Sequence, residues 1–187
     1  MKRTETSLPG VLLLEPVVHQ DHRGFFMESF NQRAMEEIGI HHTFVQDNHS
    51  RSQRGVLRGF HYQLGRPQAK LLRATRGRIF DVAVDIRRGS PDFGRWAGAE
   101  LTEENHLMLF APEGFAHGFL VLSDIAELQY KCSDFYAPEH ELGIAWNDPE
   151  LGIQWPLEGL SPILSDRDRG WTKLSEMQPA DLPRYEP

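Results

Sequence analysis

The sequence has a single cysteine, Cys132, among its 187 residues. One thiol excludes an internal disulfide framework and is typical of proteins in the reducing cytoplasm, so we expect a cytoplasmic location. No apolar run approaches the roughly 20 residues that a transmembrane helix requires, and the first residues lack the long apolar core of a signal peptide. With 40% hydrophobic and 25% charged residues, the chain is expected to form one globular domain over residues 1–187.

Positive charge is also scarce, since 20 Lys and Arg stand against 27 Asp and Glu and give a net charge of −7. This balance argues against a nucleic-acid polymer as a partner. The basic residues nevertheless gather in one central stretch, and a locally positive cleft in an acidic protein favours a small phosphorylated ligand. They are Arg51, Arg54, Arg58, Arg66, Lys70, Arg73, Arg76 and Arg78.

Apolar residues occur in short segments separated by turn residues rather than in long periodic runs. Phe80, Val82, Val84 and Ile86 alternate with other residues, a period of two that predicts a strand with two distinct faces. Many short strands with Gly and Pro turns predict an all-β sandwich or barrel. Further strands are expected at 11–14, 25–30, 56–63, 107–111, 119–122 and 125–132, and short helices at 32–37, closed by Gly39, and after Ser165.

The alternation of residues in one predicted strand indicates which way a tyrosine points. In the run from Ile125 to Cys132, the alternation places Leu128, Tyr130 and Cys132 on one face. Tyr130 is therefore expected to point inward, where its phenol needs a hydrogen-bond partner.

The last residues, 178–187, carry three prolines and are expected to lie loosely on the surface.

Two histidines lie in motifs of interest. His61 lies in Val-Leu-Arg-Gly-Phe-His-Tyr-Gln, and His117 lies in Pro-Glu-Gly-Phe-Ala-His-Gly-Phe, whose Pro-x-Gly-x-x-His spacing resembles the second signature of the cupin β-barrels. A metal-binding cupin carries His-x-His and a Glu in its first signature. Here a lone His61 is followed by Lys70, whereas zinc and non-haem iron need three or four converging ligands. We therefore expect no metal, and instead proton transfer next to an anion.

Six segments together resemble the nucleotide-sugar 3,5-epimerases of deoxysugar synthesis, the dTDP-4-dehydrorhamnose 3,5-epimerase family. The resemblance extends from about Pro9 to about Asp168, and its specificity comes from the occurrence of all six segments in order. They are residues 23–29 (RGFFMES), 44–50 (FVQDNHS), 56–63 (VLRGFHYQ), 80–87 (FDVAVDIR), 112–119 (PEGFAHGF) and 146–148 (WND).

The resemblance implies a cupin-type jelly-roll barrel with a few short helices. It also implies a reaction that removes the proton α to a 4-keto group and returns it on the opposite face, at C3 and at C5. His61 matches the family's base, a role that suits imidazole chemistry, and Asp168 matches the carboxylate that accepts Nδ1–H and leaves Nε2 free. Lys70 matches the lysine on the side of the enolate, and Tyr130 matches the acid.

Substrate-binding positions carry over from the same resemblance. Arginine forks suit diphosphate oxygens, and aromatic faces such as Phe26 and Tyr136 suit stacking on a pyrimidine base. One departure is Arg167, which stands where the family commonly has Lys and keeps the charge. The implied binding residues are Arg23, Phe26, Glu28, Gln46, Asn48, Arg58, His117 and Tyr136.

The expected reaction converts dTDP-4-dehydro-6-deoxy-D-glucose into dTDP-4-dehydro-L-rhamnose without a cofactor, because the ketone of the substrate acidifies the protons. The family also implies a homodimer in which an N-terminal strand, here Val11 to Val18, adds to the partner's sheet and covers an exposed edge. An enzyme that epimerises only C3, or acts on another nucleotide sugar, remains an alternative with the same catalytic residues. A cupin oxygenase lacks support without His-x-His, and a non-catalytic binding module would be expected to lose the base, acid or lysine.

Overall fold

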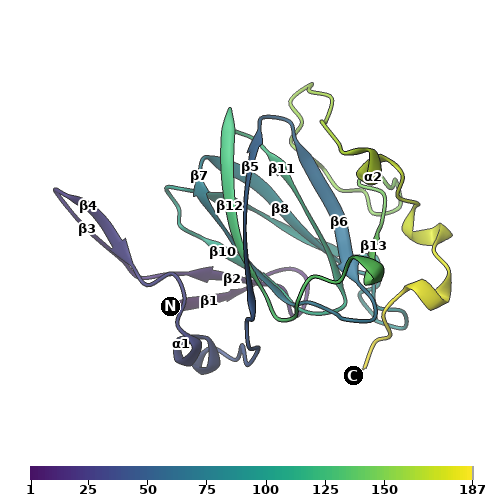
Figure 1. The fold of residues 1–187 in the computed structure, drawn as a ribbon, viewed down its shortest axis with the longest axis horizontal. Coiled ribbons are helices and arrows are strands. Elements are labelled where there is room, and N and C mark those ends of the chain that lie inside the picture. The colour runs from purple at the N-terminus through teal and green to yellow at the C-terminus, as the bar shows by residue number, and fades with distance from the viewer. Residues whose placement is uncertain (187) are drawn as a thin grey trace.

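The computed structural model describes residues 1–186, which form two antiparallel sheets and a separate hairpin (Figure 1). This arrangement confirms the predicted all-β class. The six-stranded sheet contains, in spatial order, β1 (Lys2–Glu5), β2 (Leu12–Glu15), β10 (Met108–Ala111), β7 (Lys70–Arg76), β12 (Ile125–Cys132) and β5 (Gln46–Gln53). The five-stranded sheet contains β13 (Glu141–Gly143), β6 (Leu57–Gln63), β11 (Phe115–Val121), β8 (Arg78–Asp85) and β9 (Trp96–Thr102).

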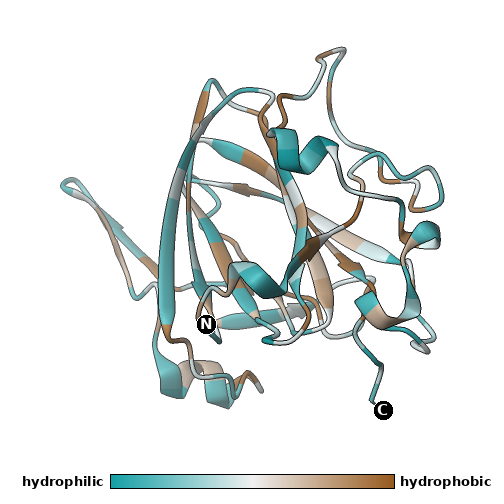
Figure 2. Cartoon of the chain, turned by 45° about the vertical axis from the view of Figure 1, so that its right-hand side comes forward, coloured by the Kyte–Doolittle hydropathy of each residue, from teal (hydrophilic) through white to brown (hydrophobic). Residues whose placement is uncertain are grey.

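The main hydrophobic core lies between the two sheets. Leu72 and Leu128 from the six-stranded sheet pack in one cluster with Ile79 and Phe119 from the five-stranded sheet. A second cluster covers the other face of the five-stranded sheet, where Phe60 and its neighbours meet the chain that follows β13. Both faces of the five-stranded sheet are therefore covered, and apolar segments gather on the strands inside the molecule (Figure 2).

The predicted helices are confirmed. Helix α1 spans Gln32–Glu37, with Asn31 accepting hydrogen bonds from the first turn and Gly39 following at a φ of 86°, a conformation that glycine adopts without strain. Helix α2 spans Asp166–Arg169 and is capped by Ser165, whose Oγ accepts from the backbone N–H of Asp168. Three short 3₁₀ helices complete the list, η1 (Pro138–His140), η2 (Leu174–Glu176) and η3 (Pro179–Asp181). Among residues 1–186, no helix is long and apolar enough to span a membrane.

The N-terminal region pairs with strands of its own chain. Residues 12–15 form β2, which pairs with β1 on one side and β10 on the other within its own chain. Both edges of β2 are occupied within one chain, and the addition of the segment from Val11 to Val18 to a partner's sheet stays a prediction. The next strands, β3 (Val18–Asp21) and β4 (Gly24–Met27), form a two-stranded hairpin that stands away from the barrel (Figure 1).

The chain end makes defined contacts instead of lying loosely. The backbone N–H of Arg88 donates to Pro183 O at 2.8 Å, and the N–H of Tyr185 donates to Arg88 O at 3.0 Å. The hydroxyl of Tyr62 on β6 donates to Asp181 O at 2.6 Å. The tail is thus tied by backbone bonds to the segment that follows β8 and by the hydroxyl of Tyr62 to the five-stranded sheet, which its proline content did not indicate.

Candidate active site

A cavity of about 320 Å³ opens between the two sheets, with residues of β5, β6, β7, β11 and β12 in its walls. It brings together most of the side chains that the sequence singled out. Those that line it are Gln46, Asn48, Arg58, His61, Lys70, His117, Tyr130 and Tyr136. These eight predicted residues therefore meet at one place although they are spread over about half of the chain.

Strand β5 supplies a polar wall to this cavity. Its residues alternate between inward and outward positions, and the inward ones are Gln46, Asn48, Ser50 and Ser52. The first three line the cavity, and Ser52 Oγ accepts from Nε and Nη2 of Arg58 at 3.2 and 3.0 Å. A strand that is polar on its inward face shows no hydrophobic alternation, which explains why the sequence did not predict β5.

His61 and Asp168 form a tight pair. Nε2 of His61 lies 2.5 Å from Oδ1 of Asp168, and the carboxylate side chain is only 4% exposed. Burial raises the pKa of Asp168, but the hydrogen bonds from His61, Ser165 and Trp171 outweigh it, so the pKa lies below its usual range and the group is an anion at neutral pH. The expected pairing is confirmed, but the atoms are reversed, because Asp168 on α2 reaches the ring nitrogen farther from the strand. Nδ1 is therefore the ring nitrogen that does not meet Asp168.

His117 stands directly opposite His61. The two are register partners on the antiparallel strands β11 and β6, and both line the cavity. The strands approach closely beside them, because a Cβ on Gly59 would lie 2.6 Å from the Cα of Gly118. Glycine at position 59, with a φ of 115°, thus permits a backbone contact that any side chain would prevent.

A second carboxylate holds His117. Nε2 of His117 lies 2.9 Å from Oδ1 of Asp81, a residue that is fully buried. Sequence reasoning did not select Asp81 as a site residue. The available signal was an aspartate inside a strand whose other face is continuously apolar, because a buried charge requires a partner.

Lys70 and Tyr130 face the cavity from the six-stranded sheet. Burial lowers the pKa of Lys70, an effect that the nearby Cys132, Glu141 and Asp81 oppose. Burial likewise raises the pKa of Tyr130, so its phenol keeps its proton at neutral pH. The inward orientation predicted for Tyr130 is confirmed, and its ring also packs against the main core cluster.

Glu141 organises the outer side of the cavity. Its carboxylate accepts from the hydroxyl of Tyr136 at 2.7 Å and from Nη1 of Arg167, and both partners line the cavity. The backbone N–H of Tyr136 donates to Oε1 of Gln46 at 2.8 Å. Glu141 was missed by sequence reasoning because its role depends on β13 lying beside β6, a contact that no local pattern reveals.

Comparison with known proteins identifies the family. The family model described as dTDP-4-dehydrorhamnose 3,5-epimerase matches residues 5–176. The chain belongs to this family. A dTDP-4-dehydrorhamnose 3,5-epimerase of Pseudomonas aeruginosa is 61% identical over 170 residues, which cover 90% of this chain and 93% of that protein. The family's cupin-like fold is the one observed here.

Two solved structures are informative. The Legionella pneumophila epimerase in complex with dTDP-4-keto-L-rhamnose superposes with a TM-score of 0.97 at 48% identity, covering 100% of this chain and 99% of that chain. A 3′-monoepimerase from Streptomyces bikiniensis in complex with dTDP-quinovose gives a TM-score of 0.88 at 39% identity, covering 96% and 91%. The family fold therefore accommodates single as well as double epimerases.

Three predicted binding residues lie outside the cavity. Arg23 and Phe26 lie on the β3–β4 hairpin, and Glu28 follows it. Nη2 of Arg23 contacts Oδ2 of Asp21 at 2.6 Å within the hairpin, and the ring of Phe26 is 72% exposed. A single chain therefore leaves these residues in solvent instead of placing them against the other binding residues.

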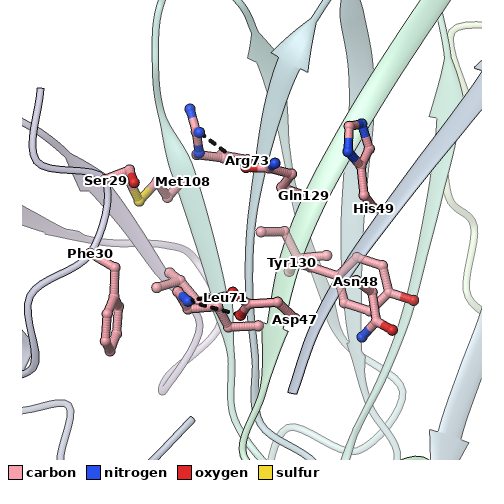
Figure 3. A pocket seen from close by; sticks show the side chains of 12 residues that line it. Ser29, Phe30, Asp47, Asn48, His49, Leu71, Arg73, Met108, Gln129 and Tyr130 are labelled. Atoms are coloured by element: carbon pink, nitrogen blue, oxygen red, sulfur yellow. Dashed lines mark hydrogen bonds and ion pairs between the residues drawn. The ribbon is translucent and has the colours of Figure 1, made fainter. Parts of the chain in front are cut away.

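A second cavity, of about 250 Å³, lies near the six-stranded sheet (Figure 3). Arg73 donates to Gln129 Oε1 at 3.1 Å, and Lys131 donates to both carboxylate oxygens of Asp47. In this second cavity Lys131 is thus paired with the carboxylate of Asp47, and Arg73 is hydrogen-bonded to a neutral amide. Within residues 1–186, no three His, Cys, Asp or Glu side chains converge as a metal site would require.

Proposed function

We propose that this protein epimerises C3 and C5 of dTDP-4-dehydro-6-deoxy-D-glucose and gives dTDP-4-dehydro-L-rhamnose, which makes it an isomerase. The observation that carries the proposal is that His61, which is paired with Asp168, lines one cavity with Lys70 and Tyr130. The family supports the same activity. Epimerisation of C3 alone is the second candidate, because the similar Streptomyces bikiniensis structure is that of a 3′-monoepimerase.

His61 is the base in this proposal. Its Nδ1 atom takes the proton from the carbon next to the 4-keto group, and the resulting imidazolium donates Nε2–H to the ionised Asp168. A carboxylate in this position keeps the ring in one tautomer and stabilises the cation that forms. The electrons of the broken C–H bond move into the enolate, whose oxygen is stabilised by the nearby ammonium of Lys70.

Tyr130 is the acid. It lies on β12 of the six-stranded sheet, whereas His61 lies on β6 of the five-stranded sheet, so the two groups approach the cavity from opposite walls. The phenol donates its proton to the enolate carbon from the face opposite the base, which inverts the centre. Solvent then returns a proton to the phenolate and takes the proton held by the imidazolium of His61, so both groups are restored. The ketone of the substrate makes the proton acidic, so the proposal needs neither an organic cofactor nor a metal.

Nucleotide binding is assigned to the outer part of the cavity. Arg58, held by Ser52, is placed to meet the diphosphate in a bidentate manner, with Gln46, Asn48 and His117 as further polar contacts. Tyr136, fixed by Glu141, offers an aromatic face for the nucleotide base.

The location is proposed to be the cytoplasm. The single buried thiol, Cys132, fits a reducing compartment.

The protein is proposed to act as a homodimer in which the β3–β4 hairpin reaches the partner. An isolated two-stranded hairpin is marginally stable in water, and this one leaves Phe25 and Phe26 55% and 72% exposed. Insertion of the hairpin into the partner's cavity would bury these rings and deliver Arg23, Phe26 and Glu28 to the nucleotide.

Mixing two inactive variants tests this arrangement. A His61→Asn chain keeps its hairpin, and an Arg23→Ala/Phe26→Ala chain keeps its base. After subunit exchange, half of the dimers are mixed and each has one complete site, so about a quarter of the wild-type activity is expected. Full exchange without recovered activity would show that the hairpin does not serve the partner's site.

The activity itself is tested by NMR of the 4-keto sugar nucleotide with the protein in D₂O. Deuterium is expected at both C3 and C5, with accumulation of the L-rhamno product. Exchange confined to C3, with a product inverted only there, would select the second candidate. Binding without exchange at either carbon would reject both.

A further inference from the structure

Trp171 contacts both members of the catalytic pair but does not line the cavity. It follows α2 and lies three residues after Asp168. Its indole Nε1–H donates to Oδ1 of Asp168 at 3.4 Å, the same oxygen that lies 2.5 Å from Nε2 of His61. The indole and imidazole rings also meet edge to face, with centroids 6.4 Å apart and planes at 70°.

The backbone of β13 fixes the indole from its other side. A Cβ on Gly143 would lie 2.6 Å from Nε1 of Trp171 and would also overlap Cε2. Gly143 is the register partner of His61 across β13 and β6. The indole is therefore wedged between the strand beside the base and the carboxylate behind it, and the absent side chain at position 143 provides the space.

We infer that Trp171 is a positioning residue that shares Oδ1 of Asp168 with His61 and so sets how strongly this carboxylate holds the imidazole proton. The inference rests on the role of His61 as the base, proposed above. Two donors on one carboxylate oxygen compete for its electron density. Without the indole donor, Asp168 becomes a stronger acceptor for Nε2–H, and the imidazolium form of the pair is stabilised.

Trp171→Phe tests the inference because it keeps an aromatic ring and removes the N–H donor, and the volume that is lost with the indole is matched by the control below. Other charged groups around the pair are unchanged by it, namely His117 on β11, Lys70 on β7, Tyr130 on β12, Arg58 on β6, Glu141 on β13 and Arg167 on α2. The acid limb of the kcat/KM profile is expected to move to higher pH by about 0.5 unit, which lowers the rate about threefold on that limb and leaves the plateau unchanged.

Trp96→Phe is the matched control. The indole of Trp96 donates to Leu151 O at 3.0 Å in the core, so this substitution also removes one indole hydrogen bond but leaves the pair intact. It is expected to lower stability without moving the pH profile. Gly143→Ala is the second variant. Its methyl group would overlap both Phe60 O and Cε2 of Trp171, so it displaces the indole and is expected to move the limb in the same direction as Trp171→Phe.

A readout independent of turnover separates this inference from the proposed function. Imidazole ¹⁵N shifts of His61, followed against pH in the free protein, report the titration of the pair. The inference holds if the midpoint rises in Trp171→Phe but not in Trp96→Phe, even if His61→Asn retains proton exchange and the base is reassigned. Unchanged midpoint and profile in a folded Trp171→Phe protein would reduce Trp171 to a packing residue and overturn the inference.

Discussion

Replacing Asp168 with Asn is the most direct perturbation of the proposed base. The substitution keeps the shape of a side chain that is 4% exposed and removes the charge that lies 2.5 Å from Nε2 of His61. It leaves unchanged the backbone N–H of residue 168, which donates to Oγ of Ser165, the N-cap residue of α2. The fold is therefore expected to persist, and the effect falls on the pair itself.

Two effects of this substitution add. A hydrogen bond to a charged group contributes about 1.5–3 kcal/mol, which corresponds to a loss of roughly 10- to 150-fold in stabilisation of the imidazolium. The amide of Asn also can donate to Nε2, which places the ring proton on Nδ1, the nitrogen that must be free. Together these effects are expected to lower kcat by about 10²–10⁴, the range for losing a general base.

The assay is deuterium exchange at C3 and C5 measured by NMR, with dTDP binding measured by calorimetry. We expect both exchange rates to fall together while the dissociation constant for dTDP stays within about twofold of wild type, since Asp168 does not line the cavity. His61→Asn serves as the reference for complete loss of the base. Wild-type exchange at either carbon in a folded Asp168→Asn protein would refute the proposed function of the pair at that carbon.

Further predictions concern the acid, the diphosphate contact, the metal and acid stability. Tyr130→Phe should let deuterium enter the substrate while inversion slows, most visibly at C5; wild-type inversion at both centres would assign the acid to water or another residue. Arg58→Ala should weaken substrate binding by about 1.5–3 kcal/mol and affect an analogue without the diphosphate less; equal losses in calorimetry would place Arg58 away from the phosphates. Exhaustive chelation should leave activity unchanged, and a loss restored by iron or zinc would contradict the metal-free mechanism. The folded pKa of Asp168 lies below its ordinary 3.8, so its contribution to stability is complete above that value and lost as pH falls through the folded pKa; urea unfolding of wild type and Asp168→Asn against pH should show their difference vanish at low pH.

Residue patterns were sufficient for several elements of the fold. Alternation in residues 125–132 predicted strand β12 and the inward side of Tyr130, because every second residue of a strand faces the same way. The helix at 32–37 was predictable from its closing glycine at position 39. Strand β5 was not predicted, since its inward side chains serve a cavity rather than a core and so carry no hydrophobic signal.

The site required the fold. His61 and Asp168 are 107 positions apart, and their pairing came from the family resemblance rather than from any local pattern. The resemblance did not indicate which imidazole nitrogen meets the carboxylate, which depends on where α2 lies relative to β6. The partners Asp81 and Glu141 were likewise missed, because Asp81 holds His117 of another strand and Glu141 meets Arg167 of helix α2.

The placement of the proposed base and the proposed acid on different sheets has a stereochemical consequence. His61 belongs to the five-stranded sheet and Tyr130 to the six-stranded sheet, so a planar enolate between them is sandwiched, with each of its faces turned to one wall. Inversion is then a property of the barrel as a whole, which holds two proton carriers at a spacing set by the packing of Leu72, Leu128 and Phe119 between the sheets. A proton donor moved from β12 to the β6 wall would deliver to the face it was taken from, and the same barrel would exchange protons without changing the sugar.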